Sequence, residues 1–256
     1  MTRVTPFFTV IVTTYNASAT IERTLDSVFH QTFRDFEVII IDDHSNDDTV
    51  ARMNAMLQHD AQDSVQLIVN HNNRGVSFTR NQGITASHGQ YISFLDGDDL
   101  WTPDKLQVQA DVITQQGAEW VFANYTVIDP HYHVLSTRYR TPGIYGFEEM
   151  ITNGNPVGLL TVVLSRKLLD KHRFSNVPHE DYDLWLELAA DGHQGVLINA
   201  VLASYMKKSD SVSNNKFKTV GWTYQIFRRH NVSRARAIGL LVNYARNVIS
   251  RRRGAS

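Results

Sequence analysis

Four apolar runs rich in β-branched residues recur along the first hundred residues and constrain the fold most strongly. They span residues 8–12, 38–41, 65–69 and 91–95. Each gap between them is long enough for a helix, and Ser45 and Asn46 are good capping residues before the second one. Apolar residues in the first two gaps follow helical spacing. This alternation predicts a parallel sheet with helices packed on its faces.

The regular alternation ends near Leu100. Pro103 is expected to open a helix that runs to about Gln116. Residues 119–129 and 133–140 are typical of two strands joined by a turn, and 161–170 of a strand that runs into a short helix. A further helix is expected from about Glu180 to Asp191, closed by Gly192. The second half of the chain is therefore predicted to be less regular than the first.

Charge is distributed unevenly along a chain whose formal net charge is −1. No acidic residue follows Asp210, whereas ten basic residues do, so the first 210 residues carry about −11. Within 233–253 the apolar residues fall on one helical stripe with arginines largely at its edges and ends: Ile238, Leu241, Val242, Ala245, Val248 and Ile249. This pattern predicts a helix packed on the body or on a second subunit, or one lying on an anionic membrane.

Several classes of site are excluded by what the sequence lacks. Without cysteine there is no disulfide, zinc-thiolate site or thiol nucleophile. The segment after the first strand, "TTYNASAT", has no glycine, and no P-loop motif is present, so backbone cradling of phosphate is not expected. The first apolar run is too short to span a membrane and precedes no cleavage site. We therefore expect a cytoplasmic protein whose partners do not include nucleic acid.

Acidic residues gather where two predicted strands end, at Asp42-Asp43 and at "DGDD", residues 96–99. The carboxyl ends of parallel strands meet at one edge, so these clusters would repel each other unless a cation or hydrogen-bond donors lie between them. Asp96 and Asp98 can both turn toward one divalent ion. Helix capping by Asp99 or Thr102 is the alternative, and it accounts for one carboxylate only.

Two arginines, Arg74 and Arg80, follow the third strand near the same edge. One guanidinium and a divalent ion together would clamp a diphosphate.

The segment "PHEDYDLWLELA" carries a carboxylate at the start of an apolar helical face. Asp181 shares the i, i+3, i+4, i+7 spacing with Leu184, Trp185 and Leu188. Such a carboxylate either interacts with the helix dipole, a role that Glu180 would serve equally well, or acts as a general base whose pKa is raised by burial. Spacing alone does not decide between these two roles.

Taken together, the motifs resemble those of the family 2 glycosyltransferases, which are inverting, nucleotide-sugar-dependent enzymes of GT-A fold. The matching pieces, in order, are "VIVTTYN", "QTFRDFEVIIIDDHSNDDT", "NRGVSFTRNQGI", "GQYISFLDGDDLWTPDKL" and "PHEDYDLWLELA". The resemblance covers about residues 7–205. It implies an α/β domain at 1–208 with a mostly parallel, Rossmann-like sheet, whose nucleotide-sugar half is 1–100 and whose acceptor half, of α+β type, is 101–208. The basic helical tail, 209–256, is not covered.

The resemblance also implies roles for single residues. Thr13, Tyr15 and Asp43 would hold the nucleoside, with Arg80 beside the nucleotide. In the D-x-D motif, Asp98 would bind Mn²⁺ or Mg²⁺, and Asp96 would contact the ribose or the metal. Asp181 matches the catalytic base, and Glu180 takes that role if the alignment shifts by one position.

The implied reaction moves a sugar from a nucleoside-diphosphate sugar, with a UDP-sugar favoured, to a saccharide hydroxyl. The basic tail suggests a lipid-linked acceptor at the inner membrane face, in surface polysaccharide assembly, with the protein held peripherally. The segment "NGNPVGLLTVVL", residues 153–164, would build part of the acceptor wall. The rival functions are a nucleotidyltransferase acting on a sugar phosphate and a non-catalytic nucleotide-sugar-binding protein. His131 and His133 are interpreted as surface residues, and Trp101 and Trp185 as packing residues.

Overall fold

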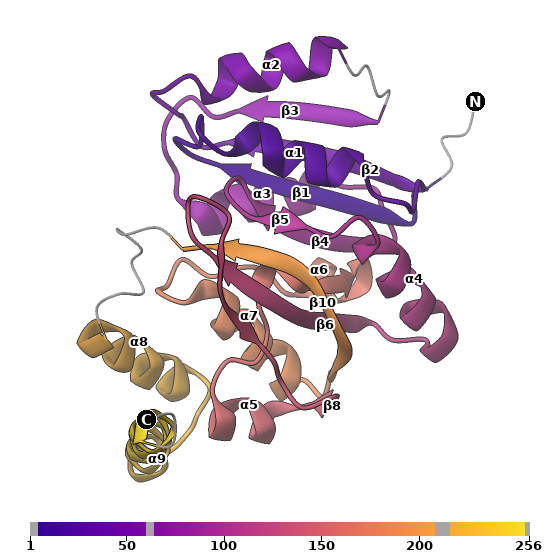
Figure 1. The fold of residues 1–256 in the computed structure, drawn as a ribbon. Coiled ribbons are helices and arrows are strands. Elements are labelled where there is room, and N and C mark those ends of the chain that lie inside the picture. The colour runs from indigo at the N-terminus through magenta and orange to yellow at the C-terminus, as the bar shows by residue number, and fades with distance from the viewer. Residues whose placement is uncertain (1–4, 60–63, 208–215, 254–256) are drawn as a thin grey trace.

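A mixed sheet lies at the centre of the protein in the computed structural model, which describes residues 5–59, 64–207 and 216–253 (Figure 1). Its strands are β1 (Phe8–Thr14), β2 (Phe36–Asp42), β3 (Val65–Val69), β4 (Tyr91–Asp96), β5 (Leu100–Trp101), β6 (Trp120–Ile128), β7 (Val134–Arg138), β8 (Gly143–Tyr145), β9 (Val163–Ser165) and β10 (Gly195–Met206). The main strand order is β3-β2-β1-β4-β9-β6-β10-β5, with β7 beside β6 and β8 beside β10.

Helices connect most of these strands. They are α1 (Ile21–Phe29), α2 (Thr49–His59), α3 (Val76–Ala86), α4 (Lys105–Gln116), α5 (Phe147–Asn153), α6 (Arg166–Lys171), α7 (Glu180–Ala190), α8 (Lys216–Arg229) and α9 (Arg234–Arg253), with a 3-10 turn at Leu159–Thr161. Each helix expected from the sequence is present, although α4 begins at Lys105 and not at Pro103. In the described part of the chain, no helix combines the length and apolarity that a membrane crossing requires.

The four expected strands of the first half pair in parallel, as predicted. β1 lies between β2 and β4, and β3 pairs with the outer side of β2. Beyond β4 the expected mostly parallel sheet becomes mixed, because β9 is antiparallel to both β4 and β6. Within the described residues, β6 and β10 add one further parallel pair. The first half therefore has the regular βαβ arrangement, and the second half mixes parallel and antiparallel strands.

The sheet is buried on both faces, which explains why its strands are nearly continuous apolar runs. Along β1, Val10 and Val12 pack under α1, α2 and α4, whereas Ile11 faces the core that includes α3, α5 and α7. Gly83 lets α3 approach closely, because a Cβ there would lie 2.5 Å from the Ile11 side chain. The two helical layers fix the positions of the strand ends that form the candidate site.

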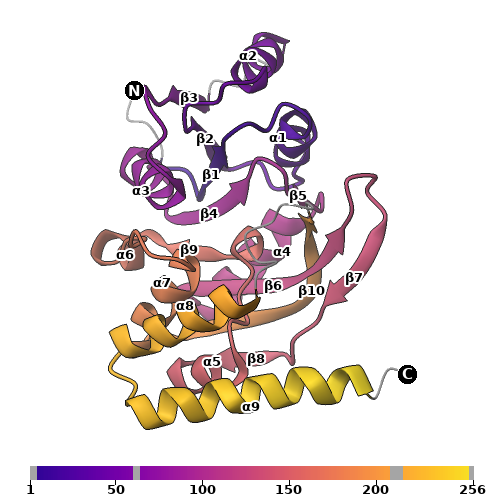
Figure 2. The ribbon, with the colours of Figure 1, turned by 90° about the vertical axis from the view of Figure 1, so that its left-hand side faces the viewer.

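Helices α8 and α9 pack side by side, and α9 lies beside α5 (Figure 2). The packed surface of α9 includes Ala237, Leu240 and Leu241, whereas Ile238 and Val242 are 55% and 52% exposed. Of the predicted apolar stripe, Leu241 therefore packs on the body, whereas Ile238 and Val242 do not. The predicted boundary between 208 and 209 lies outside the described residues.

Asp99 does not cap the helix that follows it, contrary to expectation. Its carboxylate accepts a hydrogen bond from the Met206 amide at 2.9 Å. The residue before α4 is Asp104, which makes no side-chain cap. The Thr102 hydroxyl donates to the Asp104 carboxylate and to the Leu202 carbonyl. Asp99 thus fastens the end of β10 to the acidic turn, a contact between residues distant in sequence.

Candidate active site

The carboxyl ends of β1, β2 and β4 lie side by side and form one wall of a cavity of about 340 Å³. The register places Thr13 opposite Asp96 and Thr14 opposite Asp42. The residues implicated by the sequence that line this cavity are Thr13, Tyr15, Asp43, Asp96 and Asp98. We call it the donor cavity. The position matches the expectation that ligands bind beyond the carboxyl ends of parallel strands.

Asp43 organises the loop that follows β3. One of its oxygens accepts from the Asn70 side chain at 2.9 Å, and the other accepts from the Gly75 amide at 2.7 Å. The Arg74 amide donates to both oxygens. Burial acts to raise the pKa of Asp43, but these hydrogen bonds outweigh it and hold the pKa below its ordinary value. Asp43 therefore stays ionised at the cavity wall.

The Asp96-Gly97-Asp98 turn closes the adjacent side of the cavity. A Cβ on Gly97 would lie 2.9 Å from the Thr14 hydroxyl oxygen, so only glycine fits without a shift. Asp96 accepts a hydrogen bond from the Thr13 hydroxyl at 2.8 Å. Asp98 lines the cavity next to it. Both carboxylates of the motif therefore border the donor cavity.

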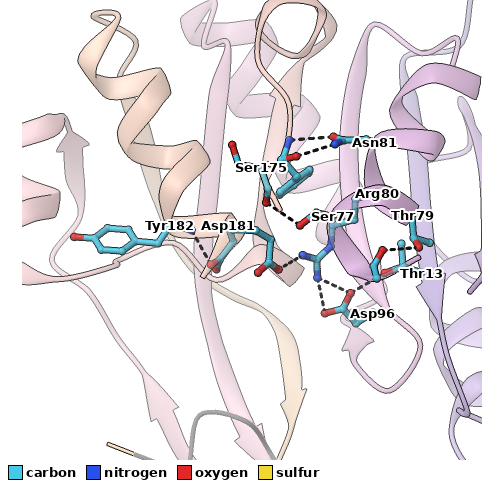
Figure 3. Close-up of polar contacts among 12 residues, drawn as sticks. Thr13, Ser77, Thr79, Arg80, Asn81, Asp96, Ser175, Asp181 and Tyr182 are labelled. Atoms are coloured by element: carbon cyan, nitrogen blue, oxygen red, sulfur yellow. Dashed lines mark hydrogen bonds and ion pairs between the residues drawn. The ribbon is translucent and has the colours of Figure 1, made fainter. Parts of the chain in front are cut away.

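Arg80 is buried between two carboxylates, as Figure 3 shows. Its Nη2 donates to both Asp96 oxygens, at 2.9 and 3.1 Å, and its Nη1 donates to Glu180 Oε1 at 2.5 Å. The side chain is only 4% exposed and does not line the donor cavity. Burial acts to lower the pKa of Arg80, but Asp96 and Glu180 raise it above its ordinary value. The guanidinium joins the donor cavity to the start of α7.

Neighbouring residues of α3 hold the segment before α7 in place. The Ser77 hydroxyl donates to the Ser175 carbonyl at 2.9 Å, and Asn81 exchanges two hydrogen bonds with the Phe174 backbone (Figure 3). Because Arg80 lies on the same helix, α3 positions both the acidic turn and the α7 start.

Asp181 lies in the first turn of α7 and is half-buried. Its carboxylate accepts from the Tyr182 amide at 2.7 Å and from the Asn155 side chain at 3.3 Å. Burial, followed by repulsion from Glu180, raises the pKa of Asp181 to about 6. This value suits a group that must accept a proton near neutral pH. Glu180, the alternative base, is engaged by Arg80.

Asn155 was not predicted individually, although it falls in the loop expected to form an acceptor wall. Its amide orients Asp181, and its Oδ1 accepts from the Val157 amide at 3.1 Å. A polar residue just before Pro156 in a loop was the available signal, but local spacing does not show which carboxylate such an amide contacts.

A divalent cation fits the donor cavity on the chemistry of its walls. The lining includes the carboxylates of Asp43, Asp96 and Asp98 but no lysine or arginine side chain. Within the described residues, however, no three His, Asp or Glu side chains are placed so that they could hold a metal ion by themselves. Asp98, the last residue of the D-x-D motif and the metal ligand expected from the sequence, lines this cavity. A metal held there would need oxygens from a bound diphosphate to complete its coordination.

The two histidines predicted to be surface residues and the two tryptophans predicted to be packing residues do not line the donor cavity. His133 is exposed and lies 3.2 Å from Asp129, and His131 is exposed too. Trp101 and Trp185 are buried packing residues, as predicted. Trp101 also donates from its indole nitrogen to the Leu160 carbonyl at 2.7 Å.

Comparisons with known proteins identify the family and the fold. Residues 9–171 match the family model described as "Glycosyl transferase family 2". The putative teichuronic acid biosynthesis glycosyltransferase TuaG of Bacillus subtilis is 29% identical, over 98% of this chain and 100% of its own length. A UDP-Glc:alpha-D-GlcNAc-diphosphoundecaprenol beta-1,3-glucosyltransferase of Escherichia coli, WfgD, is also 29% identical, over 92% of this chain and 90% of its own.

Two solved structures share the fold. The crystal structure of S. aureus TarS 1-349 in complex with UDP-GlcNAc has a TM-score of 0.73 at 18% identity, covering 93% of this chain and 71% of that one. A mannosyltransferase from Pyrobaculum calidifontis in complex with GDP-Man and Mn²⁺ has a TM-score of 0.70 at 18% identity, covering 95% and 70%. Both support a GT-A fold, and the family match favours sugar transfer over nucleotidyl transfer. The chain belongs to glycosyltransferase family 2.

Proposed function

We propose that the protein is an inverting glycosyltransferase that moves a sugar from a nucleoside-diphosphate sugar, with UDP as the favoured nucleotide, to a hydroxyl of a lipid-linked saccharide. Surface polysaccharide assembly is the proposed process. Two kinds of relative support it: WfgD carries a UDP-Glc donor and a diphosphoundecaprenol acceptor in its name, and TuaG is named for teichuronic acid biosynthesis. The proposed donor half is 1–100 and the acceptor half is 101–208.

The observation that carries the mechanism is the position and pKa of Asp181. A continuous set of contacts runs from Asp96 through Arg80 to Glu180, the residue next to Asp181. The base is thereby held at a fixed place relative to the donor cavity, and its pKa of about 6 keeps it ionised at neutral pH.

The donor cavity offers suitable groups for a nucleoside diphosphate. Tyr15, 49% exposed, presents a ring on which a base can stack. Asp43 is an ionised acceptor for a base N–H, and Thr13 and Asp96 lie where a ribose hydroxyl would be bound. Arg80, being matched by two carboxylates, acts in this proposal by positioning Asp96 and Glu180 and by its nearby positive charge. Arg80 would therefore act beside the nucleotide without contacting it directly.

The chemical step is a direct displacement at the anomeric carbon. Asp181 accepts the proton of the acceptor hydroxyl as that oxygen bonds to C1, while the bond from C1 to the diphosphate oxygen breaks and the nucleoside diphosphate leaves. Attack opposite the leaving group inverts the configuration at C1. Mn²⁺ or Mg²⁺, when bound at Asp98 with Asp96 nearby, would supply positive charge to the leaving diphosphate.

The basic tail supports a peripheral association with an anionic membrane surface, which we place at the inner membrane face. Ile238 and Val242 are exposed on α9, a helix without acidic residues in which arginines occur at both ends. Exposed apolar side chains together with arginines are typical of interfacial helices. Sedimentation with anionic liposomes tests this point, since a variant truncated after residue 230 should then bind them more weakly than the full chain.

Transfer assays with radiolabelled UDP-, GDP- and TDP-sugars test the function directly. A lipid-linked diphosphate saccharide serves as acceptor, with Mn²⁺, Mg²⁺ or chelator present. We expect metal-dependent transfer from one donor, with the product anomer opposite to that of the donor. Asp98→Ala should weaken metal-dependent UDP binding, whereas the matched change Asp48→Ala, outside the cavity, should not. Retention of the donor's anomeric configuration would refute the displacement mechanism.

A further inference from the structure

A second cavity, of about 190 Å³, opens beside Asp181 between the loop after α5, the start of α7, and the helices α8 and α9. We call it the outer cavity. It shares no lining residue with the donor cavity. Asn155 lines it and also donates a hydrogen bond to Asp181. A molecule bound in the outer cavity would therefore lie next to the proposed base.

Two nitrogen-bearing side chains make the outer cavity suitable for an anion. Arg140 lines it, and no carboxylate of the described residues forms an ion pair with its guanidinium. Its side chain donates a long hydrogen bond of 3.5 Å to the Asn155 carbonyl. His179 also lines the cavity, and its buried Nε2 has no hydrogen-bond partner among the described residues. His179 further has a left-handed backbone, with φ 58°, a strained state often kept at functional positions.

The opposite wall of the outer cavity is apolar. Val220 and Phe227 of α8, Leu240 and Leu241 of α9, and Ile151 form most of it, and Thr219 and Thr223 of α8 line the cavity beside them. Val220 remains 44% exposed. A wall of this kind favours an apolar chain over a further sugar ring, because sugar hydroxyls would lose hydrogen bonds to water there.

The helices that supply this wall are tied to the helix that carries Asp181. Asp183 of α7 is buried and accepts from Arg229 at 3.1 and 3.2 Å and from His230 at 2.9 Å. Burial acts to raise the pKa of Asp183, but His230 and Arg229 lower it below its ordinary value. The apolar wall and the base are thus fixed relative to each other. These helices lie beyond residues 9–171, the part that matches the family model.

We propose that the outer cavity binds the phosphate and the first apolar segment of the acceptor's lipid. Arg140, with His179 beside it, would contact the phosphate, while Val220 and the α9 leucines would cover the start of the chain. This inference rests on the proposed function, since it assigns the lipid-linked part of the acceptor to a place next to Asp181. Helices α8 and α9 would then determine which lipid-linked acceptors the enzyme binds.

Another source of phosphate must be distinguished from the acceptor, namely the diphosphate of the donor. The separate linings of the two cavities predict that both ligands bind at once. The probe is therefore decyl diphosphate, kept below its micelle-forming concentration and titrated by calorimetry into protein saturated with UDP. UDP binding is measured first by itself, because its absence would count against the proposed donor site and not against the outer cavity.

The variants come as two matched pairs. Arg140→Gln removes the cavity cation, and Arg138→Gln makes the same change two residues away, outside the lining. Val220→Glu places a charge on the apolar wall, and Val134→Glu makes the same change at an exposed valine of β7. Both altered cavity residues are exposed or half-exposed, so the fold should persist, and circular dichroism checks this.

We expect the loss of a charge-assisted hydrogen bond to weaken decyl diphosphate binding about ten-fold or more in Arg140→Gln. Val220→Glu should weaken it to a similar extent, and the two control variants should stay within about two-fold of the unmodified protein. Decyl diphosphate should also bind more tightly than inorganic diphosphate. The proposal is overturned if Arg140→Gln binds like the unmodified protein, or if saturating UDP abolishes binding of the probe.

Discussion

Arg80 Nη1 donates a hydrogen bond to Glu180 Oε1 at 2.5 Å, across 100 residues of sequence. The same guanidinium binds Asp96 of the acidic turn, so one buried cation connects the donor cavity with the helix that carries Asp181. We infer that this contact sets the position of the sugar donor relative to the acceptor hydroxyl beside Asp181.

Replacing Arg80 with methionine should strongly destabilise the protein. The change leaves Asp96 and Glu180 without their cation, and breaking a buried ion pair in this way costs about 3–5 kcal/mol. Chemical denaturation measures the loss. Arg52→Met, which removes an exposed ion pair with Glu22, is the control and should change the free energy of unfolding by about 1 kcal/mol or less. Equal losses in the free energy of unfolding for the two substitutions would show that the Arg80 contacts do not stabilise the fold.

Turnover should fall with decreasing pH as Asp181 takes up a proton. Its pKa is raised to about 6, so kcat should drop about ten-fold per pH unit well below pH 6. Asp43 has a lowered pKa and stays ionised there, so UDP affinity should persist at pH 5. Parallel measurements of kcat and UDP affinity check this. A parallel loss of both would place the titrating group in the donor cavity.

Lys105 predicts a second, unrelated pH effect. It is fully buried, donates to Ser93 and Gln109, and lies 3.8 Å from the centre of the Trp101 ring. Burial without a carboxylate partner lowers the pKa of Lys105 well below its usual range, although the ring and the two acceptors favour the charged form.

Because the folded state holds this proton less tightly than the unfolded state, stability should rise with pH until Lys105 is neutral in both states. The variant Lys105→Met has no amine that can titrate at this position. The free energy of unfolding of the unmodified protein, minus that of Lys105→Met, should therefore increase between pH 7 and pH 10. A constant difference over that interval would contradict the lowered pKa. Lys167→Met, near the surface cavity of Glu119 and His193, is the control.

Asp183→Asn should loosen α8 and α9 without moving Asp181. The substitution weakens the contacts to Arg229 and His230 that hold α8 against α7. Hydrogen exchange should speed up in α8 and α9 while the strands of the first half keep their protection. Asp191→Asn, a more exposed carboxylate at the other end of α7, should leave the α8 and α9 rates unchanged. Unchanged exchange in both variants would mean that Asp183 does not anchor the tail.

The sequence predicted the elements whose signals are local. The four strands of the first half follow from β-branched runs, and the D-x-D turn and the α7 start follow from motifs with fixed spacing. Local patterns did not predict partners distant in the chain. The Asp99 carboxylate accepts from the Met206 amide, and Arg80 is buried behind the cavity wall. Ile238 is exposed because α9 packs on the body through Ala237 and Leu240. Side-chain spacing constrains a helix face, but the neighbouring element decides which face is used.

The central claim, that Asp181 is the base, is tested most directly by Asp181→Asn. Asparagine keeps the shape and can still accept from Tyr182, but it cannot take up the proton. We expect kcat to fall by on the order of 100-fold or more, which is typical of the loss of a general base. UDP affinity should be nearly unchanged. The variant should also gain up to about 3 kcal/mol of stability at pH 7, because a carboxylate whose pKa is raised to about 6 destabilises the folded state above that pH. Retention of more than about a tenth of the original turnover would contradict the account.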